Sequence, residues 1–174
     1  MKNIYVILFS LLLLSCGGNT AEKKLIDANA QLEKDLEMYQ NVWNTFLTST
    51  VNSDNFTEDV VVVTDQGDVV GIEAVKNHYL NYLNGFSEIE WKIIDAFGQG
   101  NRLVKHWNFK GKHTGDFFGI PATGNYLDLS GTTMITMKDG KIAKEHDFFD
   151  MKSMLDQLLN SDGDVVIDEY QAVN

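Results

Sequence analysis

Residues 126–150 read YLDLSGTTMITMKDGKIAKEHDFFD. Strand-forming residues lie on both sides of Asp139-Gly140, a pair that favours the two-residue type I′ turn of a β-hairpin. The stretch therefore predicts two antiparallel strands that are joined at this turn. Counting back from a two-residue turn places His146 opposite Thr133.

Strand-like segments also precede this hairpin, and amphipathic helical segments precede those strands. The expected strands cover residues 60–64, 69–70, 89–97, 102–113, 126–137 and 141–149. The expected helices cover residues 21–48, 71–84 and 151–159. Helices followed by a run of antiparallel strands predict an α+β fold in which the helices lie on one face of a curved sheet.

The composition fits one globular domain, expected at residues 22–160 and followed by an acidic tail at residues 161–174. The chain has 174 residues, of which 44% are hydrophobic and 22% are charged. Its net charge of −11 repels phosphate backbones and disfavours nucleic-acid binding. The four histidines show no metal-ligand spacing, and no cofactor-binding motif occurs, so we expect neither a metal nor a cofactor.

Residues 1–15 have the features of an export signal. The apolar run at residues 4–14 is too short to span about 30 Å of hydrocarbon as a helix. The segment LLSCGG at residues 13–18 resembles the lipobox of bacterial lipoproteins. This resemblance implies cleavage before Cys16, lipidation of its thiol, and anchoring at the periplasmic or surface face of the cell envelope, with residues 16–21 as a tether. A simple secretory signal with an incidental cysteine is the alternative.

Three segments resemble, in the same order, those of the SnoaL-like polyketide cyclase family within the nuclear transport factor 2-like superfamily. They are GIEAV at residues 71–75, GKHTGDFFGIPATG at residues 111–124 and DGKI at residues 139–142. The resemblance covers about residues 35–160. It implies a cone-shaped antiparallel sheet wrapped around the N-terminal helices, a central cavity for a small apolar or aromatic molecule, and a sheet that can pair into a homodimer.

The resemblance also implies a candidate catalytic carboxylate, because Asp150 matches the family's acid/base Asp near the end of the last strand. A carboxyl group in an apolar pocket has a raised pKa and can exchange protons with an activated carbon. Asp is also a preferred N-cap, and capping the helix that begins at Met151 is the alternative role. His146 shares a face with Asp150 in a regular strand, and either assists it or fills space where the family often has an aromatic residue.

His113 is a third candidate, because it shares a strand face with Trp107 and Phe109. It either polarises a ligand carbonyl or bonds the backbone of the loop at residues 115–124. The family's cyclases use a histidine on the strand before the last, and this chain has none at residues 126–137.

Aromatic residues spread along the chain are the candidates for an apolar ligand pocket. They are Trp43, Tyr79, Trp91, Trp107 and Phe148. The first functional hypothesis is a small-molecule binder at the cell envelope. The second is an acid/base enzyme of cyclase or isomerase type that uses Asp150, and the third is a dimeric interaction module. The surroundings of Asp150 distinguish the binder from the enzyme, because the enzyme requires Asp150 to lie inside the cavity.

Overall fold

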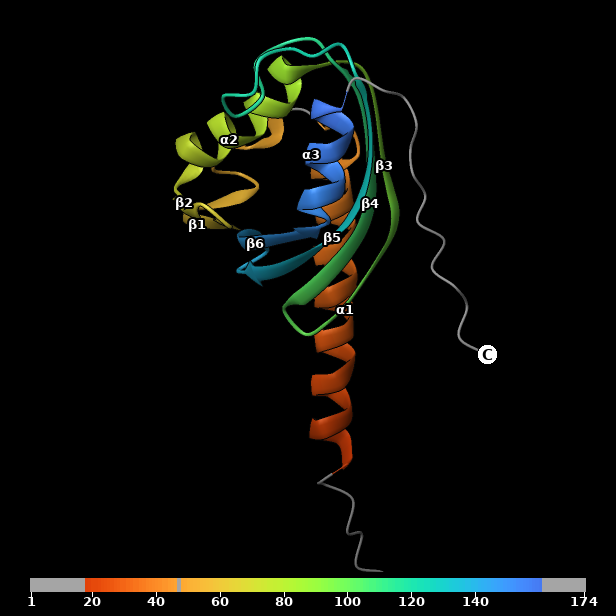
Figure 1. Ribbon diagram of the computed structural model, residues 1–174. Coiled ribbons are helices and arrows are strands. Elements are labelled where there is room, and N and C mark those ends of the chain that lie inside the picture. Colours follow the sequence, from red (N-terminus) through yellow and green to blue (C-terminus); the bar gives the residue numbers. More distant parts are fainter. Residues whose placement is uncertain (1–17, 47, 161–174) are drawn as a thin grey trace, which may run out of the picture.

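The computed structural model describes residues 18–46 and 48–160 of the chain (Figure 1). Its elements, in chain order, are α1 (Gly18–Trp43), the 3-10 helix η1 (Thr48–Thr50), β1 (Phe56–Thr64), β2 (Gly67–Val70), α2 (Ile72–Gly85), β3 (Phe86–Gln99), β4 (Arg102–His113), β5 (Tyr126–Lys138), β6 (Lys141–Phe149) and α3 (Met151–Leu159). Cys16 and the expected acidic tail lie outside the described residues.

Six strands form one curved sheet in the order β2-β1-β6-β5-β4-β3. The sheet bends around the helices and is not closed, which confirms the predicted α+β fold class (Figure 1). Neighbouring strands run antiparallel, with the exception of β1 and β6, which are parallel. The expectation of a wholly antiparallel sheet is therefore wrong for this pair. A parallel pair needs a long crossover, and here the chain passes through β2, α2 and β3–β5 before β6 returns beside β1.

Helix α1 has two halves with different surroundings. Its second half buries Tyr39, Val42 and Trp43 in the hollow of the sheet. Residues 20–31 are exposed, and Figure 1 shows this first half extending past the end of the sheet. The helix begins at Gly18, so the last four residues of the expected tether are helical. No helix in the described ranges is both long enough and apolar enough to cross a membrane.

The hairpin between β5 and β6 begins as predicted. Asp139 and Gly140 have φ angles of 53° and 74°, as a type I′ turn requires, and Lys138 opposes Lys141. The next pair joins Met137 to Ile142, which continues the regular ladder.

A β-bulge at Ala143 then shifts the register of β6. Thr136 pairs with Lys144, so Ala143 is one extra residue on β6. Thr133 therefore lies opposite Asp147, and the expectation that it faces His146 is wrong. Because side chains alternate between the two faces of a strand, the extra residue also reverses which residues of β6 face the interior.

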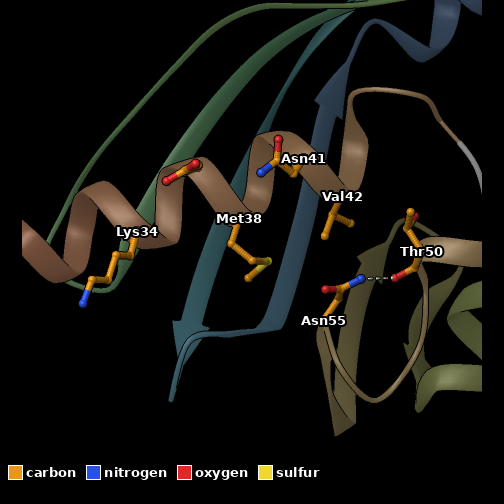
Figure 2. A pocket seen from close by; sticks show the side chains of 7 residues that line it. Lys34, Met38, Asn41, Val42, Thr50 and Asn55 are labelled. Atoms are coloured by element: carbon orange, nitrogen blue, oxygen red, sulfur yellow. Dashed lines mark hydrogen bonds between the residues drawn. The ribbon is translucent and has the colours of Figure 1, made fainter.

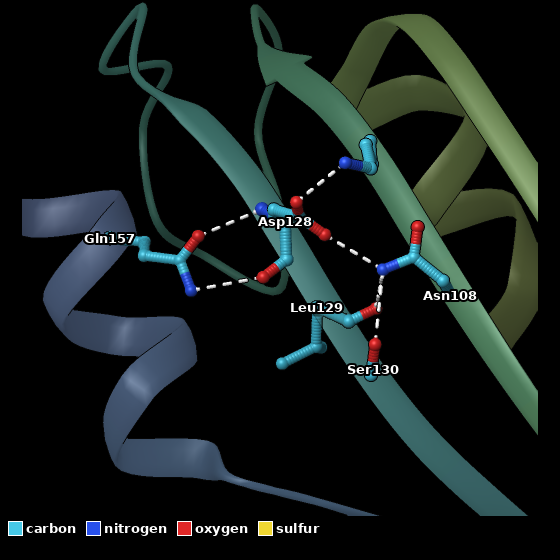
Figure 3. A network of polar contacts seen from close by, with 6 residues as sticks. Asn108, Asp128, Leu129, Ser130 and Gln157 are labelled. Carbon is cyan, nitrogen blue, oxygen red and sulfur yellow. Dashed lines mark hydrogen bonds and ion pairs between the residues drawn. The ribbon is translucent and has the colours of Figure 1, made fainter. Parts of the chain in front are cut away.

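Helix α3 covers the part of β5 that extends past the end of β6 (Figure 3). The side-chain amide of Gln157 accepts a hydrogen bond from the Asp128 backbone N–H (2.8 Å) and donates one to the Asp128 carbonyl (3.2 Å). Lys110 and Asn108 of β4 bond the Asp128 carboxylate from the other side. Gln157 thus takes the place of a neighbouring strand, and Met154 and Leu158 of α3 are buried.

Candidate functional site

Three polar side chains lie side by side on the inner face of the sheet. Lys105 of β4 is opposite Thr133 of β5, which is opposite Asp147 of β6. The Thr133 hydroxyl donates to Asp147 Oδ1 and accepts a hydrogen bond from Trp107 Nε1 (3.0 Å). Because adjacent strands are about 4.8 Å apart, the backbones of Lys105 and Asp147 are separated by about 10 Å. The row places an amine and a carboxylate on either side of a hydroxyl.

Glu145 lies one inward position before Asp147 on β6 and is fully buried. Tyr39 of α1 donates its phenol hydrogen to Glu145 Oε1 (2.6 Å), and Tyr79 of α2 donates to Oε2 (3.1 Å). Both carboxyl oxygens therefore have a donor, as a buried carboxylate requires. Glu145 links the two helices to the sheet.

Lys105 is buried, with 4% of its surface exposed, among three aromatic rings. Its Nζ lies 5.0 Å from the ring centroid of Trp91, 5.1 Å from that of Trp43 and 5.4 Å from that of Tyr39. Such contacts stabilise an ammonium group through the negative ring faces. In the described part of the chain, no group accepts a hydrogen bond from Nζ and no carboxylate forms an ion pair with it.

Burial shifts the pKa values of Lys105 and Glu145 toward each other. It lowers the pKa of Lys105, and the charges of Glu145 and Asp147 oppose this shift. It raises the pKa of Glu145, and the Lys105 charge is the strongest opposing influence. Burial also raises the pKa values of Tyr39 and Tyr79 well above 10.0, so both phenols stay protonated donors. Buried acids and bases with shifted pKa values are concentrated at functional sites.

A small cavity of about 20 Å³ adjoins this row of side chains. Its walls are Trp43, Phe46, Tyr79, Tyr82, Trp91, Lys105, Trp107, Phe109 and Asp147. The volume has room for about one water molecule, whereas pockets for drug-sized ligands measure about 300–1,000 Å³. A larger ligand can therefore enter only if the aromatic walls move.

The aromatic walls are arranged by one glycine and one backbone contact. A Cβ at Gly131 would lie 2.4 Å from Trp107 Cζ2, so the missing side chain makes room for the indole. Trp107 stacks on Trp91 at a centroid distance of 5.6 Å, and Trp91 Nε1 donates to the Trp43 carbonyl (2.7 Å). The indole N–H of Trp43 is buried without an acceptor in the described structure. The cavity wall thus holds a second unpartnered donor besides Lys105.

The loop at residues 114–125 covers the end of α2 beside this cavity. Phe118 is 40% exposed and has a φ of 49°, a strained value for a bulky residue. Its ring lies 5.2 Å from that of His78 and 5.8 Å from that of Tyr82, a residue of the cavity wall. Burial lowers the pKa of His78, and the Asp147 charge opposes this shift. Phe118 therefore packs against Tyr82, one of the residues of the cavity wall.

A larger hollow of about 400 Å³ lies at the surface, between α1 and the segment before β1 (Figure 2). Its lining residues are Lys34, Glu37, Met38, Asn41, Val42, Thr50 and Asn55. Asn55 Nδ2 donates to the Thr50 carbonyl (2.9 Å) across its rim. Neither Lys105 nor Glu145 nor Asp147 lines this hollow, so we place the candidate site at the small cavity.

Asp150 lies outside this site. It is exposed, and its carboxylate accepts a hydrogen bond from the Ser153 backbone N–H (2.9 Å) at the start of α3. The expectation of an apolar pocket around Asp150 is wrong, because β6 ends at Phe149 and the chain turns outward there. The geometry is that of the alternative role, an N-cap.

The two candidate histidines also lie away from the cavity. His113 is fully buried at the far end of β4, where Nδ1 contacts the side-chain oxygen Oγ1 of Thr123 (3.0 Å). It thus contacts the loop, as in its structural alternative, but through a side chain and not through the backbone that was expected. His146 faces outward and packs on Phe148, at a centroid distance of 4.0 Å. Phe148 is 44% exposed, so the expectation that it lines the pocket is wrong. The bulge at Ala143 turns both His146 and Phe148 outward.

The other four aromatic candidates, Trp43, Tyr79, Trp91 and Trp107, do line the cavity. Their contact with a ligand stays a prediction. The charged residues of the site, by contrast, were missed by the sequence reasoning. Lys105 had a detectable signal, because strand alternation places it on the same face as Trp107 and Phe109. Glu145 and Asp147 had no such signal, because the bulge is not evident from the sequence.

Comparison with known families decides the relationship of the chain. The profile of the SnoaL-like polyketide cyclase family matches residues 34–158, well over half of the chain. The chain belongs to this family. No similar sequence was found among curated proteins. The match agrees with the extent of the predicted resemblance, about residues 35–160.

Solved structures of this family and its neighbours share the fold. A SnoaL-like polyketide cyclase candidate from Jannaschia sp. CCS1 superimposes with a TM-score of 0.65 at 19% identity, over 75% of this chain and 92% of that chain. A phenazine biosynthesis-related protein from Pseudomonas aeruginosa gives 0.64 at 23% identity, over 77% and 90%. An LEH-like epoxide hydrolase from M. tuberculosis gives 0.58 at 14% identity, over 74% and 92%. At these identities the similarity establishes the fold alone.

Proposed function

We propose that this SnoaL-like domain binds a small aromatic or conjugated molecule at the cavity beside Lys105. The observation that carries the proposal is the buried Lys105 ammonium, which has aromatic rings around it and no hydrogen-bond acceptor in the described structure. A ligand oxygen would supply the acceptor, and the rings would supply apolar contact. The family is that of SnoaL-like polyketide cyclases, which supports the same class of function.

The charges around the cavity favour a neutral ligand. Two carboxylates, Glu145 and Asp147, act on the single amine of Lys105. An anionic ligand would add a third negative charge to a buried site, at a large desolvation cost. A carbonyl or hydroxyl oxygen accepts the Lys105 hydrogen bond without adding charge.

A ligand larger than water would enter by moving side chains on the α2 side. Phe118 lies at the tip of a loop, is partly exposed, and contacts Tyr82 of the cavity wall. Strained backbone at such a position is often found in segments that rearrange on binding. Entry past Phe118 and Tyr82 would enlarge the cavity without disturbing the sheet.

Tryptophan fluorescence tests this proposal, because all three tryptophans of the protein line the cavity. We would titrate the full-length protein with the neutral ketone 4-nitroacetophenone and with the anion 4-nitrobenzoate. We expect saturable quenching by the ketone and weaker binding of the anion. In the variant Lys105→Met the ketone should bind more weakly, whereas Lys110→Met, on the outer face of the same strand, should leave binding unchanged. Equal quenching in both variants would contradict the proposed site.

A second candidate function is proton transfer next to a carbonyl group, because Asp147 lines the same cavity as Lys105. Lys105 would polarise the ketone oxygen while Asp147 removes a proton from the adjacent carbon. The test is deuterium exchange into the methyl group of 4-nitroacetophenone, followed by NMR. Asp147→Asn should abolish exchange and retain quenching. Exchange that is unchanged in Asp147→Asn would exclude this function.

We also propose that Cys16 is lipidated and that the protein is held at the bacterial cell envelope. The lipobox-like segment motivates this proposal, and the exposed residues 20–31 of α1 would act as a helical stalk of about 18 Å between the membrane and the domain. Metabolic labelling with an alkyne fatty acid tests it. Label should enter the wild-type protein and be absent from Cys16→Ser, and equal label in both would refute it.

A further inference from the structure

Lys105 differs from the lysines that form ion pairs in the described structure. Lys110 and Lys152 are exposed and form ion pairs with Asp128 and Asp156 at 2.6 Å and 2.5 Å. Lys105 is buried, borders the cavity, and has only ring faces and more distant carboxylates around its Nζ. An amine that is not held by a hydrogen bond is free to react with a group that enters the cavity.

We propose that Lys105 is a nucleophile that forms an imine with a carbonyl compound bound in the cavity. This inference rests on the proposed function, and it names an aldehyde or ketone as the ligand class. The neutral Nζ attacks the carbonyl carbon and forms a carbinolamine. The carbon–oxygen bond then breaks, both hydrogens of the amine leave with the oxygen as water, and a carbon–nitrogen double bond remains.

Asp147 is the group placed to move the protons of this step. It lines the cavity, and one of its oxygens is bonded to Thr133, the residue between it and Lys105. It can take a proton from the attacking nitrogen and return it to the leaving hydroxyl group. Glu145 has both oxygens occupied by phenols, so it acts as a fixed counter-charge.

The aromatic rings suit the product of the reaction. A protonated imine keeps a positive charge on the Lys105 nitrogen, and the faces of Trp43, Trp91 and Tyr39 stabilise a cation at that place. The unbound amine needs the opposite property, a readily lost proton. Burial supplies it by lowering the pKa of Lys105. Burial thus enlarges the fraction of free amine before the reaction, and the ring faces stabilise the iminium after it.

The small neutral diketone 2,4-pentanedione is the probe for this reaction. It condenses with an amine to an enaminone, which absorbs ultraviolet light and adds the mass of one diketone less one water. We would treat the full-length protein with an equimolar amount and map the modified peptide by mass spectrometry. We expect Lys105 to be labelled in preference to Lys110, because burial lowers the pKa of Lys105 and so raises the fraction of free amine at neutral pH.

Lys105→Arg is the matched variant, since it keeps the charge and lacks the nucleophile, and Lys110→Arg is the control. Loss of the enaminone band in the first variant alone supports the proposal. If Lys105→Arg does not fold, the peptide map of the wild-type protein decides the question. Labelling of surface lysines with Lys105 unmodified overturns the imine.

The same samples distinguish this failure from failure of the proposed function. Tryptophan quenching by 4-nitroacetophenone without any adduct at Lys105 would leave the binding site and exclude the imine. Absence of both would remove the binding site as well.

Discussion

Removing one hydroxyl group, in Tyr39→Phe, tests whether the buried carboxylate of Glu145 is charged and depends on its donors. The Tyr39 phenol lies 2.6 Å from Glu145 Oε1, and both residues are fully buried. A hydrogen bond to a charged group contributes about 1.5–3 kcal/mol, and no water can replace the lost donor without entering the core. We therefore expect the free energy of unfolding to fall by about 1.5–3 kcal/mol at neutral pH.

Urea denaturation of Tyr39→Phe, followed by circular dichroism, measures this change. Tyr82→Phe is the matched control, because the Tyr82 hydroxyl makes no hydrogen bond within the described residues, and we expect a change within about 0.5 kcal/mol. The Tyr39 hydrogen bond lowers the pKa of Glu145, so its loss should cost most above that pKa and less in acid, where Glu145 is protonated. Equal stability of the two variants at neutral pH would refute the reasoning.

Three further substitutions test other parts of the structure. Gly131→Ala should lower the free energy of unfolding by about 1–3 kcal/mol and shift tryptophan emission, because its Cβ would overlap Trp107; unchanged emission would contradict this. Asp150→Ala should lower the free energy of unfolding by about 0.5–2 kcal/mol, because it removes the N-cap of α3. Asp150→Asn should retain both stability and ketone binding. Loss of ketone binding in Asp150→Asn would restore Asp150 as a site residue. Burial lowers the pKa of His78 below 6.5, so the unfolded chain binds a proton at a higher pH than the folded protein does. The wild-type protein should therefore lose stability relative to His78→Gln as the pH falls below 6.5. Parallel curves of stability against pH would exclude this effect.

The sequence was sufficient for the fold because its local signals agree with the tertiary structure. Asp139-Gly140 adopts the type I′ turn, and the helix that was expected to begin at Met151 does so. The family motif at residues 111–124 lies within the matched range. These features depend on residues close together in the chain, where turn chemistry and periodicity apply directly. The parallel pairing of β1 with β6 joins segments about eighty residues apart, and no local pattern encodes it.

The site was harder to predict because it depends on one irregularity. Regular alternation after the turn predicts that Lys144, His146 and Phe148 face the interior with Ile142. The extra residue at Ala143 reverses this for the rest of β6. A charged residue on an otherwise apolar strand face, as at Lys105, was visible in the sequence. Its meaning as a site residue became clear only when the bulge brought two carboxylates to the same interior.

The bulge therefore explains how Lys105, Glu145 and Asp147 come to lie together on the inner face of the sheet. Without it, Glu145 and Asp147 would face solvent, and Lys105 would be an isolated buried cation with a large desolvation cost. With the bulge, the inward face of β6 supplies two negative charges near that cation. Tyr39 and Tyr79 donate hydrogen bonds to the deeper of the two carboxylates, Glu145. The remaining carboxylate, Asp147, has one bond to Thr133 and borders the cavity. The two carboxylates thus balance the charge of Lys105 without forming a hydrogen bond to it. The amine of Lys105 and the carboxylate of Asp147 therefore stay available to a ligand.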